Sequence, residues 1–183
     1  MEDVMLDIEA LDTRVGGVIT SIGAVEFDIH TGELGRDFYA TIDARKAEAE
    51  GFTLRADTVL WWMQQELAAR KELYAPERPQ VSTKKALNRL AAFWPGNARF
   101  WSHATFDFVM VSHAYQHLGI KMPYSFRVGM DIRTLLTLTK DKDQKAFESE
   151  ICDTSRVGIA HNALDDAKSQ VKHVCSCYKV LMR

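Results

Sequence analysis

Residues 4–10 read Val-Met-Leu-Asp-Ile-Glu-Ala, and this alternation predicts a β-strand whose two faces differ in chemistry. One face carries only apolar side chains, namely Val4, Leu6, Ile8 and Ala10. Asp7 and Glu9 share the other face, and their Cα atoms would lie roughly 6.6 Å apart at the usual rise of a strand. Because two carboxylates so close together repel each other, the pair predicts a cation between them.

The rest of the chain predicts an α/β fold around this strand. Strand patterns at 18–28 and 37–43 are separated by turn residues and predict an antiparallel meander, and a short strand follows at 99–103. Helices are predicted at 56–70, 82–94, 105–118, 131–138 and 163–182. This order predicts a mixed sheet, three antiparallel strands and then parallel strands, with helices on both faces. The charged segment 139–150 predicts a mobile loop or a frayed helix.

Length and composition predict one intracellular domain. Of the 183 residues, 46% are hydrophobic, and no linker rich in Pro, Gly or Ser divides the chain, so a single domain over residues 1–183 is expected. The first residues lack a secretory signal, and no window approaches the ~20 apolar residues of a membrane span. A cytoplasmic protein without a membrane partner is therefore expected. The three cysteines, an odd number, predict reduced thiols.

The net charge limits how this chain could bind nucleic acid. A value of −2 argues against a protein that coats nucleic acid by electrostatics alone, because such domains are usually strongly basic. Two divalent ions held by acidic side chains would add four positive charges and change −2 to +2. A metal-dependent nucleic-acid enzyme therefore stays compatible with the composition.

Asp107 is a further candidate for the acidic site. It stands among Phe106, Phe108 and Val109, where an unpaired charge would be costly, so it needs a partner or a metal. The alternative is a helix-start aspartate that accepts hydrogen bonds from backbone N–H groups. The residues around Asp107 leave both interpretations open.

The last candidates lie where the C-terminal helix begins. Asn162 is a good N-cap, and Asp165 falls at the third helical position, where it could reach back to the N–H of the capping residue. Asp166 has no such structural role. His161 stands just before the helix, where its side chain can move while the helix stays fixed. The pattern therefore favours His161 and Asp166 as functional residues.

Taken together, these residues resemble the DEDDh pattern of the DnaQ-like 3′-5′ exonucleases, a family of the ribonuclease H-like superfamily. The match consists of Asp7-x-Glu9, Asp107 between two phenylalanines, and His161 followed five residues later by Asp166. Residues 58–65, Thr-Val-Leu-Trp-Trp-Met-Gln-Gln, additionally resemble the subgroup of phage exonuclease A and RNase AS. The resemblance implies a ribonuclease H-like sheet and an enzyme that releases nucleoside 5′-monophosphates from the 3′ ends of single-stranded DNA or RNA.

The resemblance also implies the cofactor and the catalytic roles. Two Mg²⁺ or Mn²⁺ ions would neutralise the phosphodiester, activate a water and stabilise the departing 3′ oxygen. By resemblance, Asp7 would bind both ions, Glu9 and Asp166 the ion that activates water, and Asp107 the second ion. His161 would take the proton from the attacking water, a role that suits an imidazole with an ordinary pKa near ~6.5.

Substrate contacts are expected from four residues. The family implies contacts just after the glutamate, so the Ala10 backbone could bind the 3′-OH and Leu11 could wedge against the last base. Trp62 could stack on a base, with core packing as the alternative for either Trp61 or Trp62. His103 could contact a phosphate, with an ordinary surface histidine as the alternative. The expected partner is a nucleic acid with a free 3′ end, and a homodimer is left open.

Two other functions stay open from the sequence. A ribonuclease H-like endonuclease would use a similar acidic cluster without the His161 base and without requiring a free 3′ end. A catalytically inactive nucleic-acid-binding module is the second alternative, and the intact set of four carboxylates and a histidine argues against it. No motif distinguishes DNA from RNA, because nothing in the sequence identifies a contact to a 2′-OH.

Overall fold

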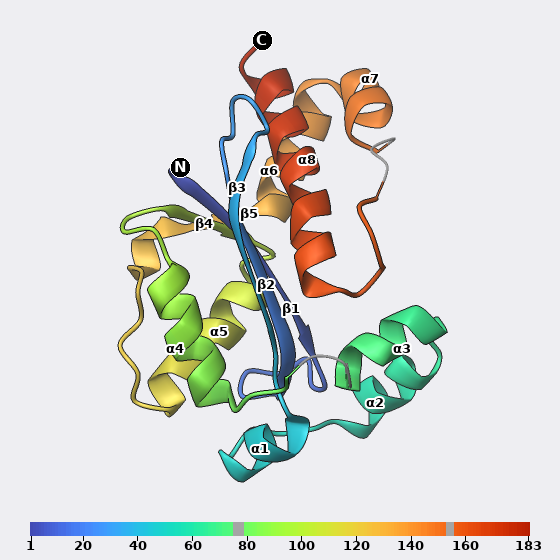
Figure 1. The fold of residues 1–183 in the computed structure, drawn as a ribbon. Coiled ribbons are helices and arrows are strands. Elements are labelled where there is room, and N and C mark those ends of the chain that lie inside the picture. Colours follow the sequence, from blue (N-terminus) through green and yellow to red (C-terminus); the bar gives the residue numbers. More distant parts are fainter. Residues whose placement is uncertain (75–78, 153–155) are drawn as a thin grey trace.

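A computed structural model gives the fold of residues 1–74, 79–152 and 156–183, built around a five-stranded sheet (Figure 1). The strand order is β3-β2-β1-β4-β5. Strand β1 pairs antiparallel with β2, and β2 with β3, whereas β4 runs parallel to both β1 and β5. The predicted mixed α/β sheet of the ribonuclease H-like type is thus confirmed. The strands are β1 Asp3–Ala10, β2 Ile19–Phe27, β3 Leu34–Thr41, β4 Arg99–Ser102 and β5 Gly129–Asp131.

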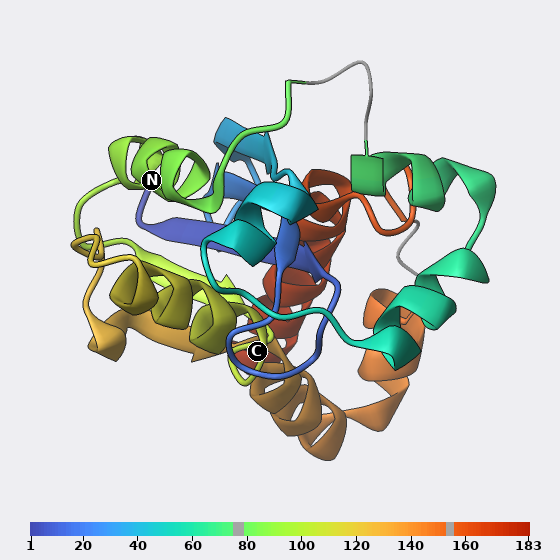
Figure 2. The same cartoon turned by 90° about the horizontal axis from the view of Figure 1, so that it is seen from below.

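Helices cover both faces of the sheet, as predicted. In Figure 1, α4 and α5 lie on one face while α6 and α8 lie on the other, and the view from below in Figure 2 shows the same two layers. Helices α1 to α3 gather at the end of the sheet that lies away from both chain termini. The helices are α1 Ala44–Ala49, α2 Ala56–Met63, α3 Leu67–Tyr74, α4 Thr83–Phe93, α5 Asp107–His117, α6 Ile132–Lys142, α7 Gln144–Ala146 and α8 Ala163–Leu181, with short helices η1 Phe126–Val128 and η2 Phe147–Ile151.

The alternation in β1 builds two separate cores. The apolar face of β1, formed by every second residue from Val4 to Ala10, packs in a cluster that includes Leu87 and Leu90 of α4 and Val111 of α5. Met5 points to the other face and packs in a second cluster with Val171 and Val174 of α8. Asp7 and Glu9 follow Met5 on this second face, as predicted, because successive strand residues point to opposite sides. The acidic pair therefore lies between the sheet and α8.

Two predicted segments differ from the structure. The helix predicted over 56–70 is two helices, because Gln64 and Gln65 donate backbone hydrogen bonds to the Trp61 and Trp62 carbonyls and close α2 with a tight turn. Segment 139–150, for which a mobile loop or a frayed helix was predicted, is helical through the end of α6, α7 and η2, so the loop alternative is wrong. Its apolar residues pack on α8 in a small third cluster, and this burial stabilises the segment.

Shorter elements escaped prediction altogether. Strand β5 has only three residues, Gly129–Asp131, and α1 has six, so neither shows a period. Among the described residues, no helix is both long and apolar enough to cross a lipid bilayer.

Candidate active site

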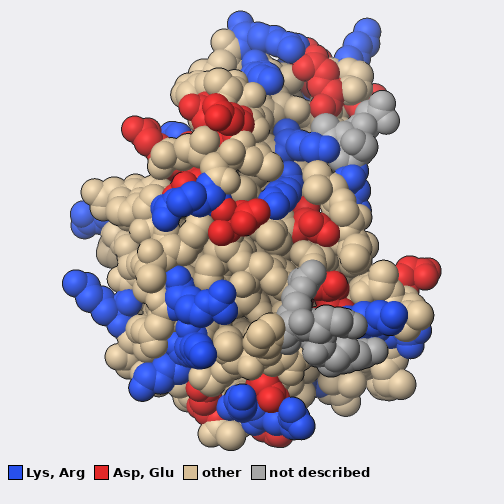
Figure 3. Space-filling model, viewed as in Figure 1, with Lys and Arg blue, Asp and Glu red and all other residues tan. Residues whose placement is uncertain are grey.

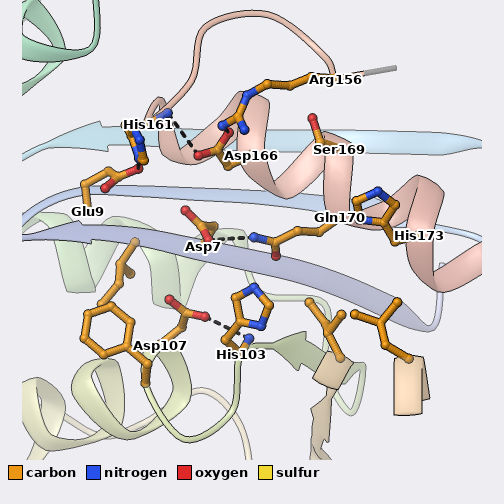
Figure 4. A pocket seen from close by; sticks show the side chains of 14 residues that line it. Asp7, Glu9, His103, Asp107, Arg156, His161, Asp166, Ser169, Gln170 and His173 are labelled. Atoms are coloured by element: carbon orange, nitrogen blue, oxygen red, sulfur yellow. Dashed lines mark hydrogen bonds and ion pairs between the residues drawn. The ribbon is translucent and has the colours of Figure 1, made fainter. Parts of the chain in front are cut away.

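A cavity of about 490 Å³ opens between the carboxyl half of β1, the start of α5 and the first turns of α8 (Figure 4). Strand β1 contributes Asp7 and Glu9, α5 contributes Asp107, and α8 contributes Asp166. All four carboxylates predicted for the acidic site, together with His161, line this one cavity. The tertiary structure thus brings together residues separated by up to 159 positions, from Asp7 to Asp166.

Asp7 is one of the two buried carboxylates on β1. Its Oδ1 accepts a hydrogen bond of 2.7 Å from Nε2 of Gln170, one turn of α8 beyond Asp166. Burial, followed by the charges of Asp107 and Glu9, raises the pKa of Asp7 well above its ordinary value. No lysine or arginine in the described part of the chain pairs with Asp7. Asp7 is therefore a carboxylate that a bound cation would ionise.

Glu9 lies at the mouth of the cavity, next to His161. Burial raises the pKa of Glu9 to about 8, with further contributions from the charges of Asp166 and Asp107. Its Oε1 lies 3.8 Å from Nδ1 of His161, which is too far for a hydrogen bond. Like Asp7, Glu9 would require a nearby positive charge to ionise fully at neutral pH.

Asp107 is the first residue of α5 and is only 1% exposed. Its Oδ2 accepts a hydrogen bond of 2.8 Å from the backbone N–H of His103, which lies before the helix. Burial nevertheless raises the pKa of Asp107 to about 7. Asp107 therefore combines the two roles considered from the sequence. Its side chain accepts from a backbone N–H at the start of the helix, and it also faces the cavity (Figure 4).

Asp165 and Asp166, both in the first turn of α8, have different roles. Asn162 caps the helix as predicted, since its Oδ1 accepts from the N–H groups of Leu164 and Asp165. Asp165 does not bond to the N–H of Asn162, which corrects the sequence expectation. Its Oδ2 instead accepts from the N–H of Ile159 at 2.8 Å and holds the preceding turn. Asp165 is therefore structural, although through a different partner.

Asp166 faces the cavity with both carboxylate oxygens engaged. Oδ2 accepts a hydrogen bond of 3.1 Å from the backbone N–H of His161, and Oδ1 forms an ion pair with the guanidinium of Arg156. Burial raises the pKa of Asp166 above its ordinary value, although Arg156 opposes this effect. Asp166 is the one cavity carboxylate that has an arginine as a partner among the described residues.

His161 adopts a backbone conformation that is uncommon for a residue with a side chain. Its φ of 62° lies in the left-handed region, and its ring packs edge-on against the rings of Trp61 and Trp62. Burial lowers the pKa of His161 below its ordinary value. The imidazole is therefore neutral near pH 7 and able to accept a proton.

The donor set fits divalent cations. One ligand atom each of Glu9, His161 and Asp166 can lie within 4.8 Å of the others, and Asp7 and Asp107 line the same cavity. Carboxylates are the hard ligands that Mg²⁺ and Mn²⁺ prefer. Buried carboxylates with raised pKa values are costly to ionise in the absence of such an ion. The residues present therefore fit a metal centre.

Trp62 does not suit the substrate contact expected from the sequence. It is only 2% exposed, and its Nε1 donates a hydrogen bond of 2.9 Å to the Ala10 carbonyl. This burial leaves no free ring face for a base, so the prediction for Trp62 is corrected. Trp61, on the adjacent position of α2, is 44% exposed and also contacts His161.

The other predicted substrate contacts stay predictions. The Ala10 carbonyl already accepts the Trp62 hydrogen bond. Leu11 is half-buried against the first core, and its backbone N–H and carbonyl bond to Val18 and Arg55. His103 lines the cavity, where its Nδ1 is buried without a hydrogen-bond partner in the described part of the chain.

Two cavity residues were missed by the sequence analysis. Gln170 could have been found, because it lies four residues after Asp166 and so on the same face of α8. Arg156 precedes the helix in an irregular segment, and no periodicity or motif marks it. Only the folded chain places its guanidinium beside Asp166.

The mixed sheet is of the ribonuclease H-like type, and its acidic cavity lies beside β1. The chain belongs to the family of Rv2179c-like 3′-5′ exoribonuclease domains, whose model matches residues 2–178. Among solved structures, it is similar in fold to the cell-death related nuclease CRN-4, with a TM-score of 0.62 and 14% sequence identity. That alignment covers 98% of this chain and 64% of the CRN-4 chain, so this chain spans less than two thirds of that nuclease. A sequence comparison with curated proteins gives no significant match.

Proposed function

We propose that this protein is a metal-dependent 3′-5′ exonuclease that removes nucleoside 5′-monophosphates from single-stranded RNA. The observation that carries the proposal is the gathering of four carboxylates, three of them buried, and one neutral histidine around a single open cavity. The family supports the polarity and the choice of RNA over DNA, because its model describes 3′-5′ exoribonuclease domains. The nucleic acid with a free 3′ end is the expected partner.

Asp7, Glu9, Asp107 and Asp166 would hold two Mg²⁺ or Mn²⁺ ions in this proposal. When bound, these ions neutralise the phosphodiester, assist ionisation of the attacking water and stabilise the departing 3′ oxygen. Gln170 supports Asp7, because the amide donates to Oδ1 and lowers the cost of ionising a carboxylate that has three other acids nearby. The His103 N–H supports Asp107 in the same way.

His161 acts as the general base. The side chain is neutral near pH 7 and lies beside Glu9, where the attacking water would be deprotonated. The two tryptophan rings hold the imidazole edge-on, and the left-handed backbone directs it back toward the cavity. Local constraint of this kind is common at functional sites.

Trp61 is the aromatic contact for the terminal nucleotide. Its indole is partly exposed next to His161, whereas Trp62 is buried beneath it. A base stacked on an exposed aromatic ring contributes ~1–3 kcal/mol, which would retain the 3′ end while the bond is cleaved. The Ala10 carbonyl contacts the neighbouring Trp62 through its hydrogen bond, and we retain the Ala10 backbone and Leu11 as candidate contacts.

An assay of end-labelled oligonucleotides tests the proposal. Single-stranded RNA and DNA, each with a free or a phosphorylated 3′ end, are incubated with Mg²⁺, Mn²⁺ or EDTA. We expect stepwise shortening from free 3′ ends, faster for RNA, release of 5′-monophosphates and no reaction in EDTA. Cleavage of a circular single strand would favour the endonuclease alternative instead.

Variants of two metal ligands complete this test. We expect Asp7→Asn and Asp107→Asn to abolish hydrolysis while the fold is retained, because each removes a charged ligand from a buried position. Asp165→Asn is the matched control, since Asp165 bonds to the Ile159 N–H and lies outside the cavity lining. More than about a tenth of wild-type activity in either ligand variant at saturating Mg²⁺ would count against the metal assignment.

A further inference from the structure

The carboxylate of Asp166 is fully occupied in this structure. One oxygen accepts the His161 N–H and the other pairs with Arg156 (Figure 4). A cation that uses Asp166 together with Glu9 would therefore meet the Arg156 guanidinium at the same carboxylate. Because two cations near one carboxylate repel each other, the ion pair and metal binding at Asp166 oppose each other.

Arg156 can leave Asp166 at little cost. Its side chain is 49% exposed, so burial does not fix it in place, whereas the Asp166 side chain is 13% exposed. Arg156 is also the only lysine or arginine among the described residues that line the cavity.

Charge balance shows what a released Arg156 would bind. Four carboxylates and two divalent cations together carry no net charge, so Arg156 would give the loaded cavity its positive charge. On the face shown in Figure 3, acidic and basic side chains are mixed along α8. A guanidinium binds phosphate oxygens through two parallel hydrogen bonds, which makes a phosphodiester its best partner.

We propose that Arg156 is a phosphate-binding residue that pairs with Asp166 in the metal-free protein and transfers to the substrate phosphate when metal occupies the cavity. The proposal rests on the proposed function for the identity of the substrate. Removing the charge of Arg156 should therefore have two opposite effects. It should strengthen metal binding, because the guanidinium competes with the metal, and weaken phosphate binding, because the guanidinium attracts the phosphate.

The first experiment titrates the protein with Mn²⁺ by calorimetry in the absence of nucleic acid. Arg156→Met removes the charge and keeps an unbranched side chain, so we expect Mn²⁺ to bind about two- to tenfold more tightly. Arg156→Lys keeps the charge and should bind Mn²⁺ like the wild type. Arg45→Met is the matched control, because Arg45 also pairs with an aspartate, Asp43, but on the exposed surface of α1.

The second experiment measures binding of uridine 5′-monophosphate and uridine to the Mn²⁺-loaded proteins. We expect Arg156→Met to weaken the monophosphate about 10- to 100-fold and to leave uridine unchanged, because only the former carries the phosphate. Arg156→Lys should weaken the monophosphate less, since it retains the charge but not the paired geometry. The KM for single-stranded RNA should rise in parallel, with a salt dependence reduced by about 0.7 in log–log slope.

The outcomes separate this proposal from the proposed function. Weaker or unchanged Mn²⁺ binding in Arg156→Met would show that Arg156 is a structural clamp on Asp166 and would overturn the exchange. Unchanged monophosphate binding would overturn the phosphate contact. A wild-type protein that binds the monophosphate through Arg156 but does not degrade RNA would instead overturn the proposed function alone.

Discussion

Gly23 lies directly opposite Asp7 in the antiparallel pairing of β1 and β2, and α8 begins in the space that its missing side chain leaves. A Cβ at this position would stand 2.2 Å from the backbone nitrogen of Leu164. The first turn of α8 therefore packs directly on the β2 backbone. This close approach places Asp166 and His161 over the face of β1 that carries Asp7 and Glu9.

Gly23→Ala tests this relationship. The added methyl group would push the start of α8 away from the sheet, so we expect a loss of about 1–3 kcal/mol in unfolding free energy. Activity on RNA should fall by more than tenfold even at temperatures where the variant is folded. Urea unfolding and kcat/KM provide the two measurements. Gly35→Ala on β3 is the control, because its Cβ would meet the flexible end of the Met1 side chain.

Asp165 and Asp166 form a matched pair for mutation. Asp166→Asn should remove activity and weaken Mn²⁺ binding by at least tenfold, because it removes a charge from the cavity. Asp165→Asn should cost only about 1 kcal/mol of stability through the weakened bond to the Ile159 N–H and leave kcat nearly unchanged. An essential Asp165 beside a dispensable Asp166 would contradict the geometry of α8.

If His161 is the general base, kcat should rise with pH. Burial lowers the pKa of His161, so kcat should rise with pH below ~6.5 and level off above it, as the neutral base becomes fully populated. His161→Ala should lower kcat by about 10²- to 10⁴-fold and flatten this limb. Mn²⁺ affinity distinguishes the two roles that the geometry allows, since a tenfold loss in His161→Ala would identify a metal ligand rather than a base.

The acidic cavity should make the metal-free protein less stable as pH rises. The pKa of Glu9 is raised to about 8 in the folded state from an ordinary 4.5, so the folded protein binds a proton that the unfolded chain releases. Relative to Glu9→Gln, the wild type should therefore lose unfolding free energy between pH 4.5 and 8. Using this difference removes the contribution of histidines that titrate in the same range.

Thermal or urea unfolding at several pH values, in EDTA and in Mn²⁺, measures this effect. Mn²⁺ should restore the stability of the wild type most strongly at high pH, because metal binding requires ionised carboxylates. Glu48→Gln on exposed α1 is the control and should show no such trend. A wild type that gains stability over Glu9→Gln as pH rises in EDTA would refute the burial argument.

The two tryptophans should respond differently to substitution. Trp61→Ala should raise the KM for RNA by about 5- to 100-fold with little change in stability, because it removes an exposed stacking surface. Trp62→Phe should cost about 1–3 kcal/mol of stability, because the buried Ala10 carbonyl loses its donor. Steady-state kinetics and thermal unfolding of both variants check this contrast. Equal effects on KM would indicate that Trp62 acts on the substrate through Ala10.

The chemistry of the strand faces and the order of the elements follow from local patterns in the sequence. The alternation from Val4 to Ala10 requires only that one face meets a core, and the structure confirms that face. Asn162 could be predicted as a helix cap because capping depends on neighbouring residues. The spacing of Asp7, Glu9, Asp107, His161 and Asp166 indicated a shared site, and the structure places all five around one cavity.

How these residues meet, and which neighbours assist them, depends on the folded chain. The choice between Trp61 and Trp62 depends on which side of α2 faces the sheet, and two residues about 100° apart on a helix carry no local signal for it. The helices over 139–151 form because they pack on α8, although their charged sequence has a weak period. The Arg156–Asp166 ion pair joins α8 to the irregular segment before it. The packing of α8 on the backbone of Gly23 likewise joins segments that are distant in the sequence. Local sequence patterns report short-range preferences, whereas such contacts depend on the packing of the whole chain.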